Sequence, residues 1–185
     1  MNFNKHYNLE GKHAFLSPSN YHWLNDDEEK LTNRWNNAWA KERGTALHQL
    51  ACDAITYGVR FEENGETLNM YVNDCIDDGL DPEVVLYFTD NAFGTADGIS
   101  FDGNVLRIYD LKTGKTPASM KQLEIYAAFF CLEYEVNPNE VLFHLRIYQS
   151  NEILVLEPEP SEIWDVMDHV IWSNGIVDKL KTTRK

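Results

Sequence analysis

The sequence predicts an α/β (α+β) fold in which a central mixed sheet of about five strands is flanked by helices. Runs typical of strands, with alternating or continuous apolar residues, occur at 83–89, 93–101, 104–112, 141–149 and 153–156. Stretches with helical periodicity precede, separate and follow these runs. With 185 residues, 43% of them hydrophobic, the chain is long enough to bury a full core in a single domain, 1–185.

The N-terminal part predicts a flexible lead-in, 1–15, followed by helices. Either serine of Leu16-Ser17-Pro18-Ser19 can cap a short first helix. A second helix is expected over 26–41, where acidic residues occupy the first turn. Trp35 and Trp39 lie on one face of it at i and i+4, which favours packing in a core or groove; stacking of one of them on a nucleic-acid base is the alternative.

A third helix is expected to begin at Gly44-Thr45, with Thr45 as its N-cap. The inward positions at i, i+3, i+4 and i+7 are His48, Ala51, Cys52 and Ile55. The histidine therefore points inward among apolar residues. A further helix, over 66–79, has apolar residues on one face and acidic residues on the other, and the acidic face is most simply exposed to solvent.

The stretch from Gly94 to Lys112 predicts two antiparallel strands joined by a tight turn. Asp102-Gly103 is expected to form this turn, because a two-residue hairpin loop needs positive φ at both central positions and Asp-Gly tolerates it. That register pairs Phe101 with Asn104 and sets Asp97 opposite Ile108. Alternation then places on one face Asp97, Ile99, Phe101, Leu106, Ile108, Asp110 and Lys112, the apolar members of which face the core.

Two carboxylates, Asp97 and Asp110, meet at the end of this face, with Lys112 one step beyond. As diagonal cross-strand neighbours they are expected about 7–8 Å apart between Cα atoms. Carboxylates at the edge of a core repel each other and are costly to remove from water unless positive charge lies between them. Because oxygen ligands of this kind suit Mg²⁺ or Mn²⁺, the sequence predicts a divalent metal site here.

These residues carry a family resemblance. Asp97, followed after twelve residues by Asp110-Leu111-Lys112, resembles the signature of PD-(D/E)XK nucleases. Four further segments are similar to the RecB-like branch of that superfamily: Leu16-Ser17-Pro18-Ser19, Gly44-Thr45-Ala46-Leu47-His48, Gly94-Thr95-Ala96-Asp97-Gly98-Ile99 and Gln122-x-x-x-Tyr126. One acid-x-lysine is common by chance, whereas five elements in the right order are not.

The resemblance implies a restriction-endonuclease-like core and a set of roles at one site. The implied metal ligands are His48, Asp97, Asp110 and the Leu111 carbonyl; the implied catalytic residues are Asp97, Asp110 and Lys112; and Gln122 and Tyr126 are implied on the substrate side. Lys112 would orient or help deprotonate the attacking water and stabilise charge on the phosphate.

Small RecB-like chains resemble phage recombination exonucleases, which resect linear duplex DNA and leave 5′-phosphate and 3′-hydroxyl ends. The resemblance therefore implies DNA as substrate, a homo-oligomer that is often a ring threaded by DNA, and a single-strand annealing protein as partner. Some relatives hold an iron–sulfur cluster on four cysteines. The three cysteines here, Cys52, Cys75 and Cys131, cannot supply that set, so no cluster is expected and the thiols are expected to be buried.

Each of these residues also has a plainer explanation. A histidine on an apolar helix face is more often a core residue than a ligand, and Lys112 could simply form an ion pair with an aspartate at the sheet end. Gln122 and Tyr126 could be a polar pair on a helix surface. Gly114-Lys115-Thr116 resembles the end of a phosphate-binding loop, but Tyr109 stands where that motif needs glycine, so no nucleotide cofactor is expected.

The C-terminal part predicts a helix opened by Pro117 that runs to Glu133, a hairpin with its turn at Ser150-Asn151, and a closing helix over 161–180 before a basic tail, 181–185. No membrane span or signal peptide is recognisable, so a cytoplasmic protein is expected, in the bacterial host if it is viral.

The net charge of −14 is the feature that fits DNA binding least. Two alternatives therefore stand beside the exonuclease: an acidic, non-catalytic binding or DNA-mimic protein on the same fold, and a site-specific endonuclease.

Overall fold

The fold is described from a computed structural model, which covers residue 7 and residues 14–183. Its chain divides into two compact units, Met1–Thr45 and Ala46–Lys185. Each unit is considered by itself below. Most of the lead-in expected at 1–15, and residues 184 and 185 of the basic tail, lie outside the described residues.

The first unit contains a 3₁₀ helix, η2 (Pro18–Asn25), and the beginning of helix α1 (Glu28–Tyr57). The break expected before Gly44-Thr45 is wrong, because α1 continues through it. The Thr45 hydroxyl donates to the carbonyl of Lys41, four residues earlier, instead of capping a new helix.

Trp35 and Trp39 are both more than half exposed on α1, so neither is a core residue. Trp35 does line a shallow groove, where its ring meets that of Phe15 edge-on with centroids 5.0 Å apart. The guanidinium of Arg43 lies 5.8 Å from the ring centroid of Trp39. Base stacking by one of the tryptophans stays a prediction.

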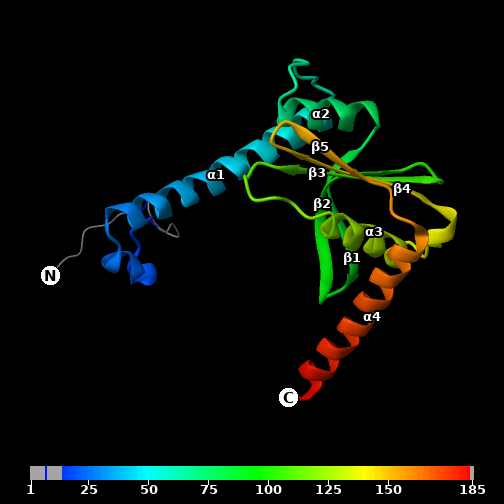
Figure 1. Cartoon of the computed structure of the whole chain (residues 1–185). Helices are drawn as coiled ribbons and strands as arrows, with labels where there is room; N and C mark the ends of the chain where they lie inside the picture. The colour runs from blue at the N-terminus through cyan, green and yellow to red at the C-terminus, as the bar shows by residue number, and fades with distance from the viewer. Residues whose placement is uncertain (1–6, 8–13, 184–185) are drawn as a thin grey trace. The chain divides into compact units, whose positions relative to one another are not determined.

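The second unit is organised around one five-stranded sheet (Figure 1). Its strands, in spatial as well as chain order, are β1 (Asp81–Thr89), β2 (Ala92–Phe101), β3 (Val105–Lys112), β4 (Leu142–Gln149) and β5 (Glu152–Leu156). The β3–β4 pair is parallel and the other three pairs are antiparallel. The predicted mixed sheet is therefore confirmed.

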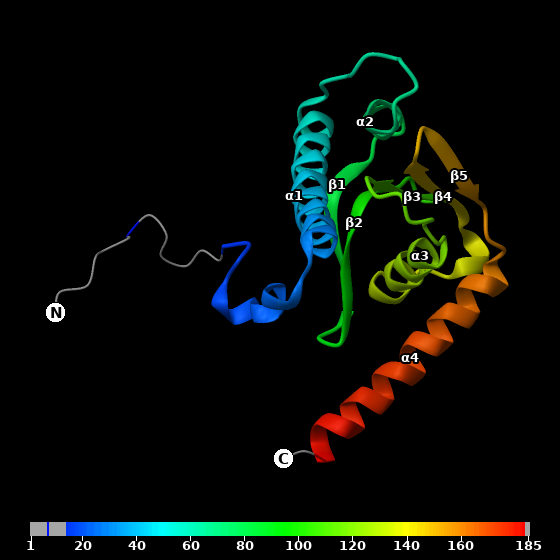
Figure 2. The same cartoon turned by 60° about the vertical axis from the view of Figure 1, so that its left-hand side comes forward.

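Helices cover both faces of this sheet (Figure 2). The remaining elements are α2 (Thr67–Asp77), α3 (Lys121–Glu133), η3 (Pro138–Glu140) and α4 (Pro160–Thr183). One core lies between the sheet, α3 and α4, and includes Ile99 and Ile108; the other joins the sheet to α2 and the end of α1, and includes Tyr109 and Leu111. None of the described helices combines the length and apolar character needed to cross a membrane.

The hairpin between β2 and β3 has a different register from the one expected. Phe101 pairs with Leu106 and Gly98 with Tyr109, so four residues, not two, separate the innermost pair. The Asp102 carboxylate accepts hydrogen bonds from the backbone N–H groups of Asn104 and Val105, which stabilises the longer loop. The shift is two residues, so the expected set of side chains still shares one face.

Two other expectations have opposite outcomes. The turn at Ser150-Asn151 is confirmed: both residues have positive φ, 54° and 63°, and Gln149 pairs with Glu152 across them. Helix α3 begins at Lys121, not at Pro117. The Ala118 N–H instead donates to the Gln149 side chain, which holds the preceding segment outside the helix.

The backbone at Gly98 packs so closely that an added side chain would have to displace its neighbours. An added Cβ would lie 3.1 Å from the Tyr71 hydroxyl, 3.2 Å from Leu80 and 3.3 Å from the Cys75 sulfur. All three residues are buried. Gly98→Ala should therefore lower the free energy of unfolding by about 1–3 kcal/mol, measured by urea denaturation.

Gly114→Ala is the matched control, since an added Cβ there meets no atom within 4 Å. We expect it to change stability by less than about 0.5 kcal/mol. Equal stabilities of the two variants would contradict this account of the packing at Gly98.

Candidate functional site

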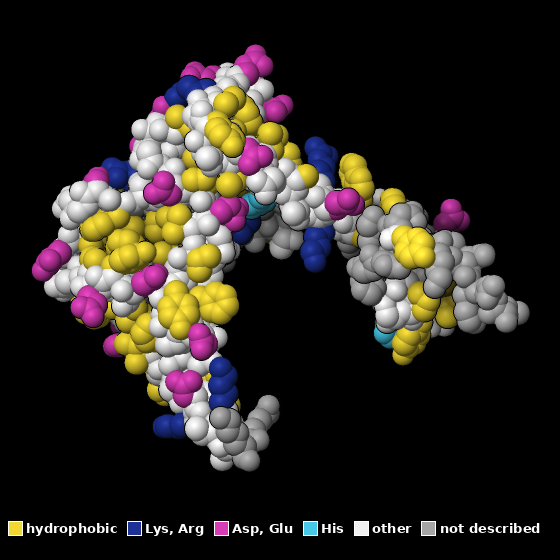
Figure 3. Space-filling view, turned by 180° about the vertical axis from the view of Figure 1, so that it is seen from behind, with side chains coloured by type: hydrophobic (Ala, Val, Ile, Leu, Met, Phe, Trp, Pro, Cys, Tyr) yellow, Lys and Arg dark blue, Asp and Glu magenta, His cyan; other side chains and the backbone are white. Residues whose placement is uncertain are grey.

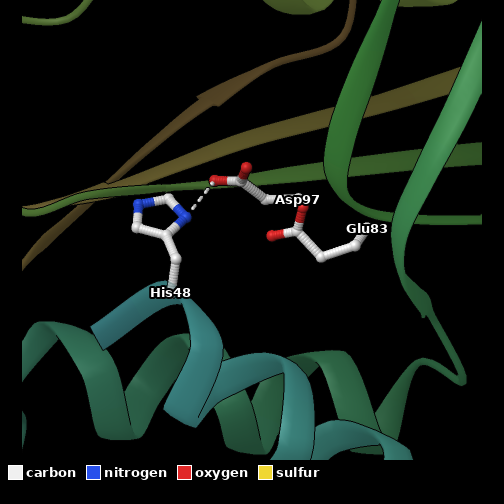
Figure 4. Close-up of side chains that lie close together, drawn as sticks. All are labelled: His48, Glu83 and Asp97. Carbon is white, nitrogen blue, oxygen red and sulfur yellow. Dashed lines mark ion pairs between the residues drawn. The ribbon is translucent and has the colours of Figure 1, made fainter. Parts of the chain in front are cut away.

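Three potential metal ligands from three elements converge beside the sheet (Figure 4). His48 comes from α1, Glu83 from β1 and Asp97 from β2, and each offers a ligand atom within 4.8 Å of the others. His48 Nδ1 lies 3.4 Å from an Asp97 carboxylate oxygen. The same oxygen accepts a hydrogen bond of 2.9 Å from the Leu111 N–H, so the aspartate is tied to both α1 and β3.

Glu83 was not among the residues singled out from the sequence. The β1–β2 register pairs Pro82 with Gly98 and Val84 with Ala96, which sets Glu83 across from Asp97. Its φ of +53° lies in the left-handed region that residues other than glycine seldom adopt. Such local strain is concentrated at functional sites, so the backbone supports a role for Glu83 that its sequence position alone does not reveal.

The electrostatics of the three groups are mutually dependent. The hydrogen bond with Asp97 raises the pKa of His48 above its usual value. Partial burial, followed by the charge of Asp97, raises the pKa of Glu83. The imidazolium is therefore favoured by its carboxylate neighbours, and a positive charge at this point relieves the repulsion between the two acids.

Asp110 and Lys112 form a second group next to the first. The Asp110 side chain is only 3% exposed, and Lys112 Nζ lies 3.0 and 2.9 Å from its two oxygens. Burial, followed by the charge of Asp97, raises the pKa of Asp110. This contact matches the ion pair considered for Lys112; it does not test a catalytic role.

The two substrate-side candidates sit at the edge of this group. Gln122 accepts a hydrogen bond of 2.9 Å from Lys112 Nζ. The Tyr126 hydroxyl donates to the Thr95 carbonyl at 2.6 Å, and Gly94 leaves room for its ring, because a Cβ there would lie 2.9 Å from it. Each side chain therefore links α3 to a strand that carries a site residue.

The loop between β3 and α3 is held by the side chain of Gln149, the last residue of β4. Gln149, paired with Lys112 in the parallel β3–β4 register, donates to the carbonyls of Gly114 and Thr116 and accepts from the Ala118 N–H. These three bonds hold the loop that follows Lys112. Nothing in the sequence indicated that Gln149 would hold this loop, because its three partners are all backbone groups.

The residues present fit a divalent cation. Carboxylate and imidazole ligands suit Mn²⁺ and Mg²⁺. One Asp110 oxygen is buried without a well-aligned hydrogen-bond donor among the described residues, although Lys112 is close. His48, Glu83 and Asp97 could hold the ion, with Asp110 next to them; for the expected Leu111 carbonyl only the N–H contact to Asp97 is seen.

Compared with known proteins, the chain matches no family model, no curated protein and no solved structure. Its function has therefore to be inferred from the chemistry of this site.

If these residues bind a cation, removing one negative charge from the cluster will lower the affinity for that cation. We expect Mn²⁺ to bind the wild-type protein in calorimetric titrations and to raise its melting temperature, whereas Glu83→Gln and Asp97→Asn should each lower the affinity at least about tenfold. Affinity should also fall between pH 7.5 and pH 6, because the raised pKa of His48 makes protons stronger competitors for the imidazole.

Glu63→Gln serves as the matched control, because its side chain is 84% exposed and lies away from the cluster. It should bind Mn²⁺ as the wild type does. Unchanged affinity in Glu83→Gln would show that Glu83 is not a ligand.

Proposed function

We propose that this protein is a metal-dependent deoxyribonuclease that resects linear duplex DNA as an exonuclease and leaves 5′-phosphate and 3′-hydroxyl ends. The observation that carries the proposal is the convergence of His48, Glu83 and Asp97 beside the Asp110–Lys112 pair. This arrangement combines a cluster of acidic metal ligands with a fixed ammonium group. The motif resemblance to RecB-like PD-(D/E)XK nucleases supports the same conclusion.

In this proposal each residue has a defined task. His48, Glu83 and Asp97 would hold the cation, and the Leu111 N–H fixes the Asp97 carboxylate in place. Lys112, held by Asp110 and Gln122, directs its ammonium group toward the phosphate or the attacking water. Bound Mg²⁺ or Mn²⁺ would activate water and neutralise charge on the phosphate.

The proposal extends to the setting in which such an enzyme acts. The substrate is DNA, and the enzyme acts as a homo-oligomer together with a single-strand annealing protein. It acts in the cytoplasm, which for a phage protein is the cytoplasm of the bacterial host. These statements rest on the resemblance.

One observation favours a different function. The net charge is −14, and Figure 3 shows acidic side chains distributed over the face it presents. An acidic protein that binds a partner without catalysis would have such a surface. Yet the acids in that view alternate with hydrophobic patches, and a DNA mimic would not need the buried Asp110 with its lysine.

Digestion of linear and covalently closed circular DNA separates these functions. With Mg²⁺ or Mn²⁺ we expect the protein to shorten linear duplexes progressively and to leave closed circles intact. Cleavage of closed circles would identify an endonuclease. No digestion of either substrate with either metal would contradict the enzyme proposal and favour the binding protein.

Substitutions at the second group should separate catalysis from folding. Asp110→Asn and Lys112→Ala should each lower the rate of DNA digestion at least about 100-fold. Burial raises the pKa of Asp110, so ionisation of this carboxyl opposes folding once the pH exceeds its unfolded value. Asp110→Asn should therefore be no less stable than the wild type at pH 7.5 in urea denaturation without metal.

Asp90→Asn, in the distant turn between β1 and β2, is the control and should keep full activity. The catalytic roles assigned to Asp110 and Lys112 would be refuted if either variant, Asp110→Asn or Lys112→Ala, kept wild-type activity.

A further inference from the structure

The second half of α4 carries apolar side chains that the domain does not bury. In the first half, Ile163 and Met167 are buried in the core shared with α3. Beyond them the helix extends past the end of α3 in both views (Figures 1 and 2). There Trp172 is 62% exposed and Leu180 55% exposed.

These residues form one stripe. Trp172, Ile176 and Leu180 occur at i, i+4 and i+8, so they lie along one side of α4 over about 12 Å. The opposite side is already occupied: Asn174 and Asp178 bond to Asn91 in the turn between β1 and β2. Thr89 also bonds to Asn174, and Lys181 to Asn91, so the stripe faces away from the polar contacts described for this half of the helix.

A groove continues the stripe toward the N-terminal half of α4. It lies between α3 and α4, has a volume of about 490 Å³, and is lined by Lys121, Ile125, Asp165, Val166, His169 and Val170, among others. The rings of His169 and Trp172 are 5.3 Å apart, so groove and stripe form one surface. One apolar helix could lie along all of it.

Charge along α4 is asymmetric in a way that selects its own sequence as partner. The N-terminal half carries Glu162, Asp165 and Asp168 and neither lysine nor arginine, whereas Lys179 flanks the stripe near the C-terminal end. A parallel pair of such helices would place acids beside acids. An antiparallel pair places Asp168 of each helix beside Lys179 of the other, so two pairs of opposite charges form between the helices.

We propose that the surface made of Trp172, Ile176, Leu180 and the α3–α4 groove binds the same surface of a second copy of this chain, with the two α4 helices antiparallel. If the two-fold axis passes near Asn174, Trp172 lies opposite Ile176. Leu180 of one copy is then level with Asp168 and His169 of the other, at the groove. This contact is isologous and closes at two copies, and it does not depend on the proposed nuclease activity.

Association can be measured by analytical ultracentrifugation of the full chain over a range of concentrations. We expect a dimer in equilibrium with monomer, and Leu180→Glu should raise the dissociation constant at least about tenfold. Ile171→Glu is the matched control: Ile171 is also exposed, at 48%, but lies on another side of α4. It should leave the dissociation constant unchanged, with circular dichroism confirming that both variants fold.

A charge exchange tests the orientation of the helices. Asp168→Lys and Lys179→Glu should each weaken the dimer, because each places like charges together in the antiparallel pair. The double variant Asp168→Lys/Lys179→Glu restores opposite charges and should recover most of the wild-type affinity.

Three results would overturn the proposal. They are a monomer at every concentration, a dimer that Leu180→Glu leaves intact, and a double variant no tighter than either single one. A monomer at every concentration would indicate that the stripe binds a different partner, such as an amphipathic helix of another protein. Failure of this proposal would leave DNA digestion unaffected, so the two can be judged separately.

Discussion

The arrangement of the site depends on like charges held close together at the edge of the sheet. Glu83, Asp97 and Asp110 come from three neighbouring strands, and burial, followed by the charge of Asp97, raises the pKa of both other acids. Fixed partners offset this repulsion: the Leu111 N–H and His48 for Asp97, and Lys112 for Asp110. The fit of Gly94 against Tyr126 lets α3 pack closely on β2, the strand that carries Asp97.

The sequence predicted which side chains meet better than how the backbone brings them together. The β2–β3 register was off by two residues, yet Asp97 and Asp110 still share a face, because faces repeat every two residues. A shift of one residue would have separated them. The alternation of apolar residues along each strand determines which face a side chain occupies. The Asp102 side-chain hydrogen bonds that lengthen the loop cannot be predicted from the Asp-Gly turn pattern.

Glu83 and the continuity of α1 escaped prediction for physical reasons. Glu83 meets Asp97 through the β1–β2 register, which an irregular turn shifts between Tyr87 and Thr89, and through a left-handed backbone conformation. Gly44 disfavours a helix by only about 1 kcal/mol relative to alanine, so it did not interrupt α1. In contrast, Ser150-Asn151 was predictable because a two-residue turn leaves few conformations.

Anomalous diffraction from crystals soaked in Mn²⁺ would test the central claim most directly, because it locates the ion without relying on activity. The account predicts a peak within about 2.0–2.4 Å of ligand atoms from Glu83, Asp97 and His48. A fully soaked crystal with no peak at this cluster, or with manganese bound only elsewhere, would contradict it.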